Sequence, residues 1–163
     1  MAEFKYQEPF PIQKDSTEYR LLTKDYVKTI EVEGRKILKI QKEGLELLAR
    51  EAYTDVSFYL RASHLQKLAN ILKDPEASDN DKFVAHTMLM NQVVAAAGEL
   101  PTCQDTGTAI AIGKKGENVW TDGNDAEAIS KGVFETYRDH NLRYSQVVPD
   151  TMFDGKNSGR NLP

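Results

Sequence analysis

Apolar residues alternate with charged ones early in the chain and then adopt a helical spacing. Alternation on both sides of Glu33-Gly34 predicts a two-stranded hairpin within residues 17–40. From residue 42 to residue 61 the apolar spacing lengthens to about 3.6 residues, the period of a helix with one buried face. That stripe consists of Leu45, Leu48, Ala49, Ala52, Tyr53, Val56, Tyr59 and Leu60.

Two more helices are predicted before residue 98. Ser63 and Gln66 have the spacing of a capping box, which places the start of a helix there. Ser78, with Asp81 in the first turn, predicts the start of a longer helix over residues 79–97. That longer helix is apolar around much of its circumference, so we expect it to be buried on several sides.

The second half of the chain has a less regular pattern. Residues 99–107 are small and polar and predict a loop, whereas residues 108–112 form an apolar run typical of a short buried strand. Residues 119–120 predict a second strand, and residues 125–140 predict a helix. The fold class is therefore α/β or mixed α+β, with a small mixed β-sheet flanked by three to four main helices.

Length and charge limit the function classes. The length of 163 residues indicates one domain. The net charge of −4 argues against a dedicated nucleic-acid binder, which is usually basic. No apolar run approaches the roughly 20 residues of a membrane helix, and the first residues lack a secretion signal. We therefore expect a cytoplasmic protein with no membrane or nucleic-acid partner.

The two ends of the chain differ from its middle. Residues 1–16 predict an irregular arm, in which Phe4, Tyr6 and Phe10 would pack on the same domain or on a second subunit. Residues 154–163 are polar and rich in Gly and Asn, and they predict a flexible tail.

Cys103 is the only cysteine in the sequence, and it lies in the predicted loop 99–107. A single thiol excludes an internal disulfide and any zinc or iron–sulfur site built only from thiols of this chain. Three interpretations stay open on spacing alone. The thiol is structural, it is a nucleophile paired with a distant histidine, or it is a metal ligand completed from elsewhere.

Motifs along the whole chain add a resemblance to a known family. In order and spacing, the sequence resembles the amino-terminal part of class I fumarate hydratase, the iron–sulfur, oxygen-sensitive type. The motifs that carry the resemblance are Pro9-Phe-Pro11, Thr17-Glu-Tyr19, Asp74-Pro-Glu-Ala-Ser78, Leu100-Pro-Thr-Cys-Gln-Asp-Thr-Gly-Thr-Ala109, Gly113-Lys-Lys-Gly116, Asn141-Leu-Arg-Tyr-Ser-Gln146 and Asn157-Ser-Gly-Arg-Asn-Leu-Pro163. The α subunit of L-tartrate dehydratase is similar to a lesser degree.

The resemblance implies a hydro-lyase of the tricarboxylic acid cycle that interconverts fumarate and L-malate with a [4Fe-4S] cluster held by three cysteines. Cys103 matches the first cluster ligand. Gln104 and Asp105 match residues that line the substrate pocket, and Asp105 would assist proton transfer at the substrate carbon. Arg143 matches a residue that binds a substrate carboxylate, and Thr106 is a weaker match to a pocket neighbour.

The chain also departs from the family, whose members are several times longer. The other two cluster cysteines and further substrate-binding residues lie beyond position 163 by that comparison. We therefore expect residues 1–163 to be the amino-terminal portion of the cluster-binding catalytic domain, inactive alone and unable to assemble the cluster. The complete enzyme is expected to be a homodimer.

Other hypotheses stay open beside this one. The chain could be the product of a naturally short gene, or a subunit similar to the L-tartrate dehydratase α subunit. It could also be a non-catalytic interaction module that pairs with a partner subunit, or a thiol hydrolase that uses Cys103.

Overall fold

A computed structural model describes residues 3–8, 11, 18–103, 108–144, 146–149 and 151–157. Within these residues, helices and small sheets alternate along the chain, as the α/β assignment predicted. In chain order the elements are β1 (Val27–Val32), β2 (Arg35–Ile40), α1 (Lys42–Phe58), α2 (Ala62–Ile71), α3 (Asp79–Ala96), β3 (Val119–Thr121), α4 (Asp125–Asp139), β4 (Val147–Pro149) and β5 (Gly155–Asn157).

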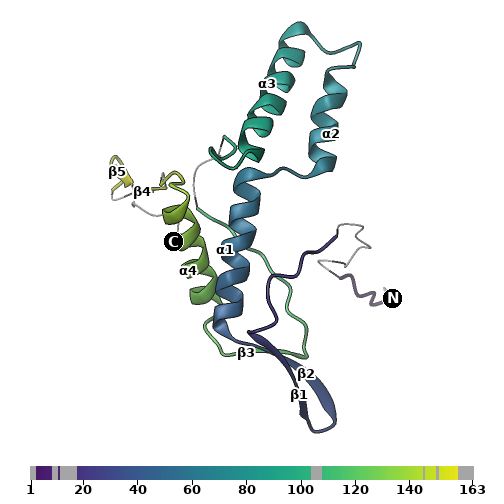
Figure 1. Cartoon of the computed structure of the whole chain (residues 1–163), viewed down its shortest axis with the longest axis vertical. Coiled ribbons are helices and arrows are strands. Elements are labelled where there is room, and N and C mark those ends of the chain that lie inside the picture. Colours follow the sequence, from purple (N-terminus) through teal and green to yellow (C-terminus); the bar gives the residue numbers. More distant parts are fainter. Residues whose placement is uncertain are drawn as a thin grey trace.

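The main sheet has the strand order β1-β2-β3 and is mixed, as predicted. Strands β1 and β2 pair antiparallel through a tight turn in which Glu33 and Gly34 have φ angles of 49° and 75°. Two consecutive positive φ values suit the right-handed twist of a hairpin, which confirms the predicted turn. Strand β3 then pairs parallel with β2, with Leu38 opposite Val119. This sheet lies at one end of the molecule (Figure 1).

Helices α1 and α4 pack side by side and form the core. At Gly132 of α4, a Cβ atom would lie only 2.3 Å from the carbonyl oxygen of Glu46 in α1, so the absence of a side chain allows this close approach. Thr136, one turn further along α4, is fully buried and donates its hydroxyl to the carbonyl of Arg50 at 3.0 Å. Val133 belongs to the buried cluster on this face.

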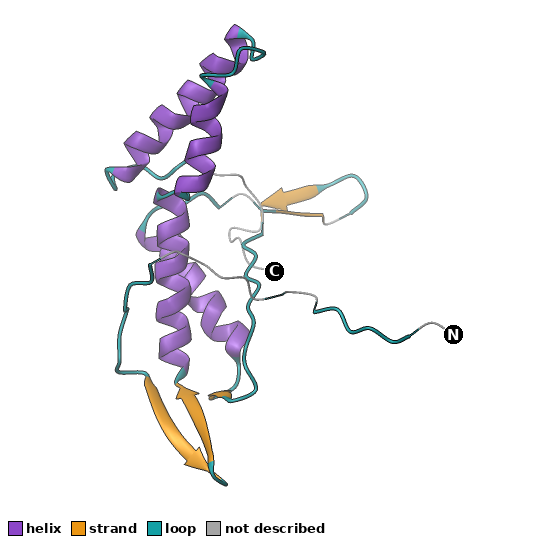
Figure 2. Cartoon of the chain, turned by 90° about the vertical axis from the view of Figure 1, so that its right-hand side faces the viewer, coloured by secondary structure: helices purple, strands orange, loops and turns teal. Residues whose placement is uncertain are grey.

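Helices α2 and α3 form a hairpin beyond the carboxyl end of α1, opposite the sheet (Figures 1 and 2). The predicted start of α3 is confirmed, because Ser78 and Asp81 form a complete capping box. The capping box predicted at Ser63 and Gln66 is wrong. Helix α2 begins two residues earlier than a cap at Ser63 would place it, with Arg61 as its N-cap and Ala62 as its first residue, and the Gln66 amide donates to Asn70 at 2.8 Å instead of reaching back to the helix start.

Helix α3 does not meet the expectation of burial on several sides. It packs through one face that includes Ala85, Gln92 and Ala95, mainly against α2. Phe83, on the opposite face, is 68% exposed, because no described segment covers it. No helix among the described residues is long and apolar enough to cross a membrane.

The apolar run at residues 108–112 is not a strand in the structure. Ala109 is half-buried against the pocket between α1 and α4, whereas Ile110, Ala111 and Ile112 are exposed. The predicted buried strand is therefore wrong, because within the described residues no neighbouring strand offers the backbone partners that a strand requires.

The terminal segments are only partly described. Phe4 and Tyr6 of the arm are exposed, so within the described residues they do not pack on their own domain, whereas Phe10 lies outside these residues. Glu8 nevertheless forms an ion pair with Lys114 at 2.9 Å. The tail is not wholly irregular, because β5 pairs antiparallel with β4.

Candidate functional site

The segment that carries Cys103 is attached to two helices at its base. The backbone N–H of Thr102 donates to the carbonyl oxygen of Ser57, in the last turn of α1, at 2.8 Å. The backbone N–H of Cys103 donates to the side-chain oxygen of Asn91, in α3, at 3.1 Å. The backbone directly before the thiol is therefore fixed by one contact from each helix.

Gln92 reinforces this attachment from inside the molecule. Its side chain is buried, its Nε2 donates to the carbonyl oxygen of Phe58 at 2.6 Å, and its Oε1 accepts from the hydroxyl of Thr102 at 3.2 Å. Both ends of the amide are thus satisfied, which a buried amide requires. On the same face of α3, Ala85 and Ala95 are small and leave room for a long polar side chain.

Cys103 itself is exposed and is not in a disulfide. Its backbone N–H donates to Asn91, and its thiol is the group that could react or bind a metal. Within the described part of the chain, no group of three or more His, Cys, Asp or Glu side chains could hold a metal ion. The sequence supplies one thiolate at most, and a single thiolate cannot hold a cubane cluster.

Arg143 lies in the loop that follows α4, between two anchored neighbours. Leu142 is buried, and its N–H donates to the carbonyl of Tyr137 at 2.9 Å. The ring of Tyr144 lies 5.9 Å from the ring of Tyr137. Arg143 is exposed. The residues on both sides of Arg143 are therefore held against Tyr137, Leu142 through its backbone and Tyr144 through its ring.

The supports of the Cys103 segment and of the Arg143 loop meet at the carboxyl end of α1. The Phe58 carbonyl accepts from Gln92, and the Phe58 ring meets the ring of His140 edge-on, with centroids 5.3 Å apart. Nε2 of His140 also lies 3.3 Å from the hydroxyl of Thr54. The end of α1 therefore anchors both candidate segments.

Acidic side chains near the end of α4 are held by arginines. Arg138 donates to Asp139 at 2.7 Å, and this hydrogen bond lowers the pKa of Asp139. Arg50 also lies 3.0 Å from Asp139. Asp139 is thus paired by two arginines at the end of α4.

The remaining predicted residues, Gln104, Asp105 and Thr106, lie outside the described residues. Their roles stay predictions. Sequence reasoning missed Asn91 and Gln92, which hold the backbone at Cys103. A polar residue seven positions after Ala85, in a stretch of α3 with no Asp, Glu, Lys or Arg after Lys82, was the pattern that could have indicated Gln92.

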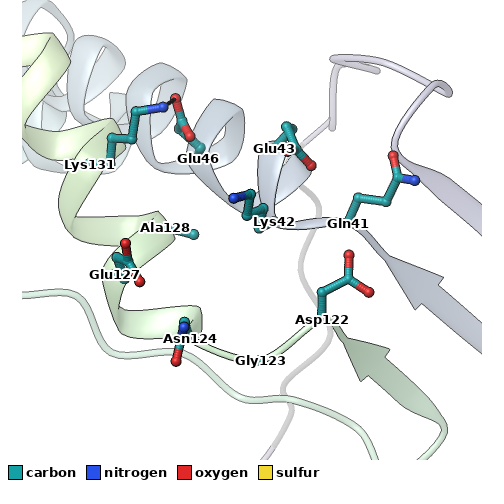
Figure 3. A pocket seen from close by; sticks show the side chains of 10 residues that line it. All are labelled: Gln41, Lys42, Glu43, Glu46, Asp122, Gly123, Asn124, Glu127, Ala128 and Lys131. Carbon is teal, nitrogen blue, oxygen red and sulfur yellow. Dashed lines mark ion pairs between the residues drawn. The ribbon is translucent and has the colours of Figure 1, made fainter.

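A large pocket lies at the opposite end of α1, where the amino-terminal ends of α1 and α4 meet (Figure 3). Its volume is about 770 Å³, and it begins at Gln41 and Lys42. Lys42 and Ser57 are separated along α1 by roughly 22 Å at about 1.5 Å per residue. The pocket is therefore remote from Cys103.

The charges of this pocket also disfavour a dicarboxylate. Its lining includes the carboxylates of Glu43, Glu46, Asp122 and Glu127. Lys131 points toward Glu46 and forms an ion pair with it at 2.7 Å (Figure 3). A doubly negative substrate would meet mostly like charge there, so this pocket is not the candidate substrate site.

A smaller, mainly apolar pocket of about 310 Å³ lies between α1, α4 and the segment around residues 109–111. Ala109, Ala111 and Val133 line it together with Tyr53. The Tyr53 hydroxyl is buried without a hydrogen-bond partner among the described residues, and burial raises its pKa. This lining offers no charged group for a carboxylate.

Comparisons with known proteins give a consistent result. A family model described as fumarate hydratase (Fumerase) matches residues 46–163. The chain is 57% identical over 160 residues to "Fumarate hydratase class I, aerobic" of Escherichia coli strain K12, a match that covers 98% of this chain and 29% of the relative. It is 49% identical over 154 residues to "Fumarate hydratase 1, mitochondrial" of Leishmania major, covering 93% of this chain and 28% of the relative.

A more distant similarity covers part of the chain. The α subunit of L(+)-tartrate dehydratase of Escherichia coli strain K12 is 33% identical over 93 residues, which is 56% of this chain and 31% of that subunit. The chain spans less than a third of the length of the fumarate hydratases that it matches, and it corresponds to their amino-terminal part.

Proposed function

Because this chain belongs to the fumarate hydratase family, we propose that it forms part of a class I hydro-lyase that interconverts fumarate and L-malate. The observation that carries this proposal is 57% identity across 98% of the chain to the class I enzyme of Escherichia coli. The match to the tartrate dehydratase α subunit is weaker in both identity and coverage, so fumarate is the preferred substrate assignment.

Cys103 would be one of three thiolate ligands of a [4Fe-4S] cluster. Its exposed sulfur and its fixed backbone support this role. When bound, such a cluster supplies a Lewis acid that polarises the substrate hydroxyl. The other two thiolates would come from sequence beyond these residues, because Cys103 is the only cysteine present.

The substrate would be held by residues on both candidate segments. Arg143 would bind one carboxylate, since a guanidinium donates two parallel hydrogen bonds to that group. Gln104 and Asp105 would line the pocket on the Cys103 side, and Asp105 would move the proton at the substrate carbon. The shared anchor at Phe58 supports an arrangement in which the two segments act on one substrate.

Assembly and location follow the same resemblance. We propose a cytoplasmic homodimer for the complete enzyme. The exposed Phe83 of α3 and the exposed Phe4 of the arm are consistent with further contacts, either to the rest of the enzyme or to a second subunit. The same exposure is the observation that would favour a non-catalytic interaction module.

The decisive experiment replaces Cys103 by Ser in the complete enzyme. We expect the variant to lose fumarate hydration and to retain less iron and sulfide after anaerobic reconstitution, because a serine hydroxyl is a poor replacement for a thiolate. Thr87→Ser, on the exposed face of α3, is the control and should keep the cluster. A fully active Cys103→Ser enzyme with a normal iron content would refute the ligand assignment.

A further inference from the structure

We propose that Asn91 and Gln92 are positioning residues that hold the backbone of Thr102 and Cys103 and thereby fix the direction in which the thiol points. The inference rests on the proposed role of Cys103 as a cluster ligand. Neither Asn91 nor Gln92 would touch the cluster itself. Both act through the two loop residues that they hold.

Hydrogen bonds converge on two adjacent residues of the loop. Thr102 uses both its N–H, which donates to Ser57, and its hydroxyl, which donates to Gln92. Cys103 uses its N–H, which donates to Asn91. Three bonds from two helices therefore restrain the backbone at the base of the loop, while the Cys103 side chain stays exposed.

The burial of Gln92 points the same way. The Gln92 side chain is only 6% exposed, so its amide must find hydrogen-bond partners inside the protein. Its Nε2 bonds to Phe58 of α1, and its Oε1 bonds to Thr102 of the loop. An apolar residue at this position would pack between Ala85 and Ala95 with no such requirement. The amide therefore links the Phe58 carbonyl to the Thr102 hydroxyl.

The two residues have different chemical requirements, and this difference makes the proposal testable. In its bond to Cys103, Asn91 acts as an acceptor through Oδ1, so Asp can replace it in that bond. Gln92 acts as a donor and as an acceptor, so Glu cannot replace it, because a carboxylate oxygen would face the Phe58 carbonyl. A role limited to helix packing would not produce this pattern.

The test measures amide hydrogen exchange at Thr102 and Cys103 in the 163-residue chain. In Asn91→Ala we expect exchange at Cys103 to become about tenfold faster, the change that corresponds to loss of one hydrogen bond. Asn91→Asp should restore slow exchange. Gln92→Glu should accelerate exchange at both amides, and amides of the α1–α4 core should keep their rates.

Gln66→Ala is the matched control, since Gln66 is a helical glutamine that bonds only within α2. If Gln92→Glu does not fold, Thr102→Val tests the same hydrogen bond from the loop side, because it removes the hydroxyl and keeps the shape. Unchanged exchange at Cys103 in Asn91→Ala, or failure of Asn91→Asp to restore it, would overturn the proposal.

A second readout separates this proposal from the assignment of Cys103. In the complete enzyme, Asn91→Ala should release iron to a chelator faster than Asn91→Asp does. If the Cys103→Ser enzyme keeps its cluster, the assignment of Cys103 as a ligand is wrong, whereas the exchange results at Thr102 and Cys103 still decide whether the backbone is held as described. If exchange responds but iron release does not, the positioning role toward the cluster is overturned.

Discussion

Replacing Gly132 by Ala tests the close packing of α1 and α4. The new Cβ would lie 2.3 Å from the Glu46 carbonyl oxygen and 2.9 Å from the Ala49 Cβ, where ordinary contacts begin near 3.4 Å. Backbone atoms cannot rotate away as a side chain can, so α4 must move by about 1 Å relative to α1.

Two effects of this substitution oppose each other. Alanine favours a helix over glycine by about 1 kcal/mol, which stabilises the variant. Overpacking a core costs about 1–3 kcal/mol, and the contact with backbone places this site at the upper end of that range. We therefore expect a net loss of about 2 kcal/mol, which lowers the thermal midpoint by about 4–8 °C for a chain of this size.

The assay is thermal and urea unfolding followed by circular dichroism. Gly113→Ala is the matched control, because no neighbouring atom lies within 4 Å of the position that its methyl group would take, and it should change the stability by less than about 0.5 kcal/mol. The propensity gain is already included in the expected net loss, so a Gly132→Ala protein as stable as the parent would mean that the close helix contact described above is wrong.

Three further results are expected. Ser78→Ala should destabilise the chain by about 1 kcal/mol in urea unfolding, because the capping box of α3 is lost, and an unchanged midpoint would contradict this. The Ser78 hydrogen bonds lower the pKa of Asp81, so their stabilisation is present above the ordinary pKa of about 3.9 and is lost as the pH falls through the lower folded value. The stability difference between the parent and Asp81→Asn should therefore shrink in acid, and a pH-independent difference would contradict it. Arg143→Lys in the complete enzyme should raise KM for the dicarboxylate about tenfold or more, with kcat less affected, because lysine keeps the charge but cannot form the paired hydrogen bonds. An unchanged KM would show that Arg143 does not bind the substrate.

Local patterns predicted the elements whose cause is local. The hairpin turn at Glu33-Gly34 and the start of α3 at Ser78 depend on residues within a few positions of each other, and both are confirmed. The helices α1 and α4 follow from apolar stripes, since each needs only one covered face.

Long-range pairing could not be predicted in the same way. The segment at residues 108–112 has the composition of a strand, but strand formation depends on a neighbour, and the sheet recruits Val119–Thr121 instead. The interpretation of Ser63 and Gln66 failed for a related reason, because the side chain of Gln66 found a nearer partner in Asn70. The spacing of residues in the sequence does not show which of several possible strand or hydrogen-bond partners a residue will take.

The candidate site was predictable only in part. Family motifs predicted a role for Cys103 and a role for Arg143, 40 residues apart in the sequence, and both roles stay predictions. The hydrogen bonds of Gln92 to Phe58 and Thr102 join three separate segments, and no local pattern encodes such a set of contacts. These bonds exist only because α3 packs beside the end of α1.

The common attachment at Phe58 has a mechanical consequence. Gln92 bonds the Phe58 carbonyl and His140 meets the Phe58 ring, so a displacement of this last turn of α1 would reach the supports of the Cys103 segment and of the Arg143 loop at the same time.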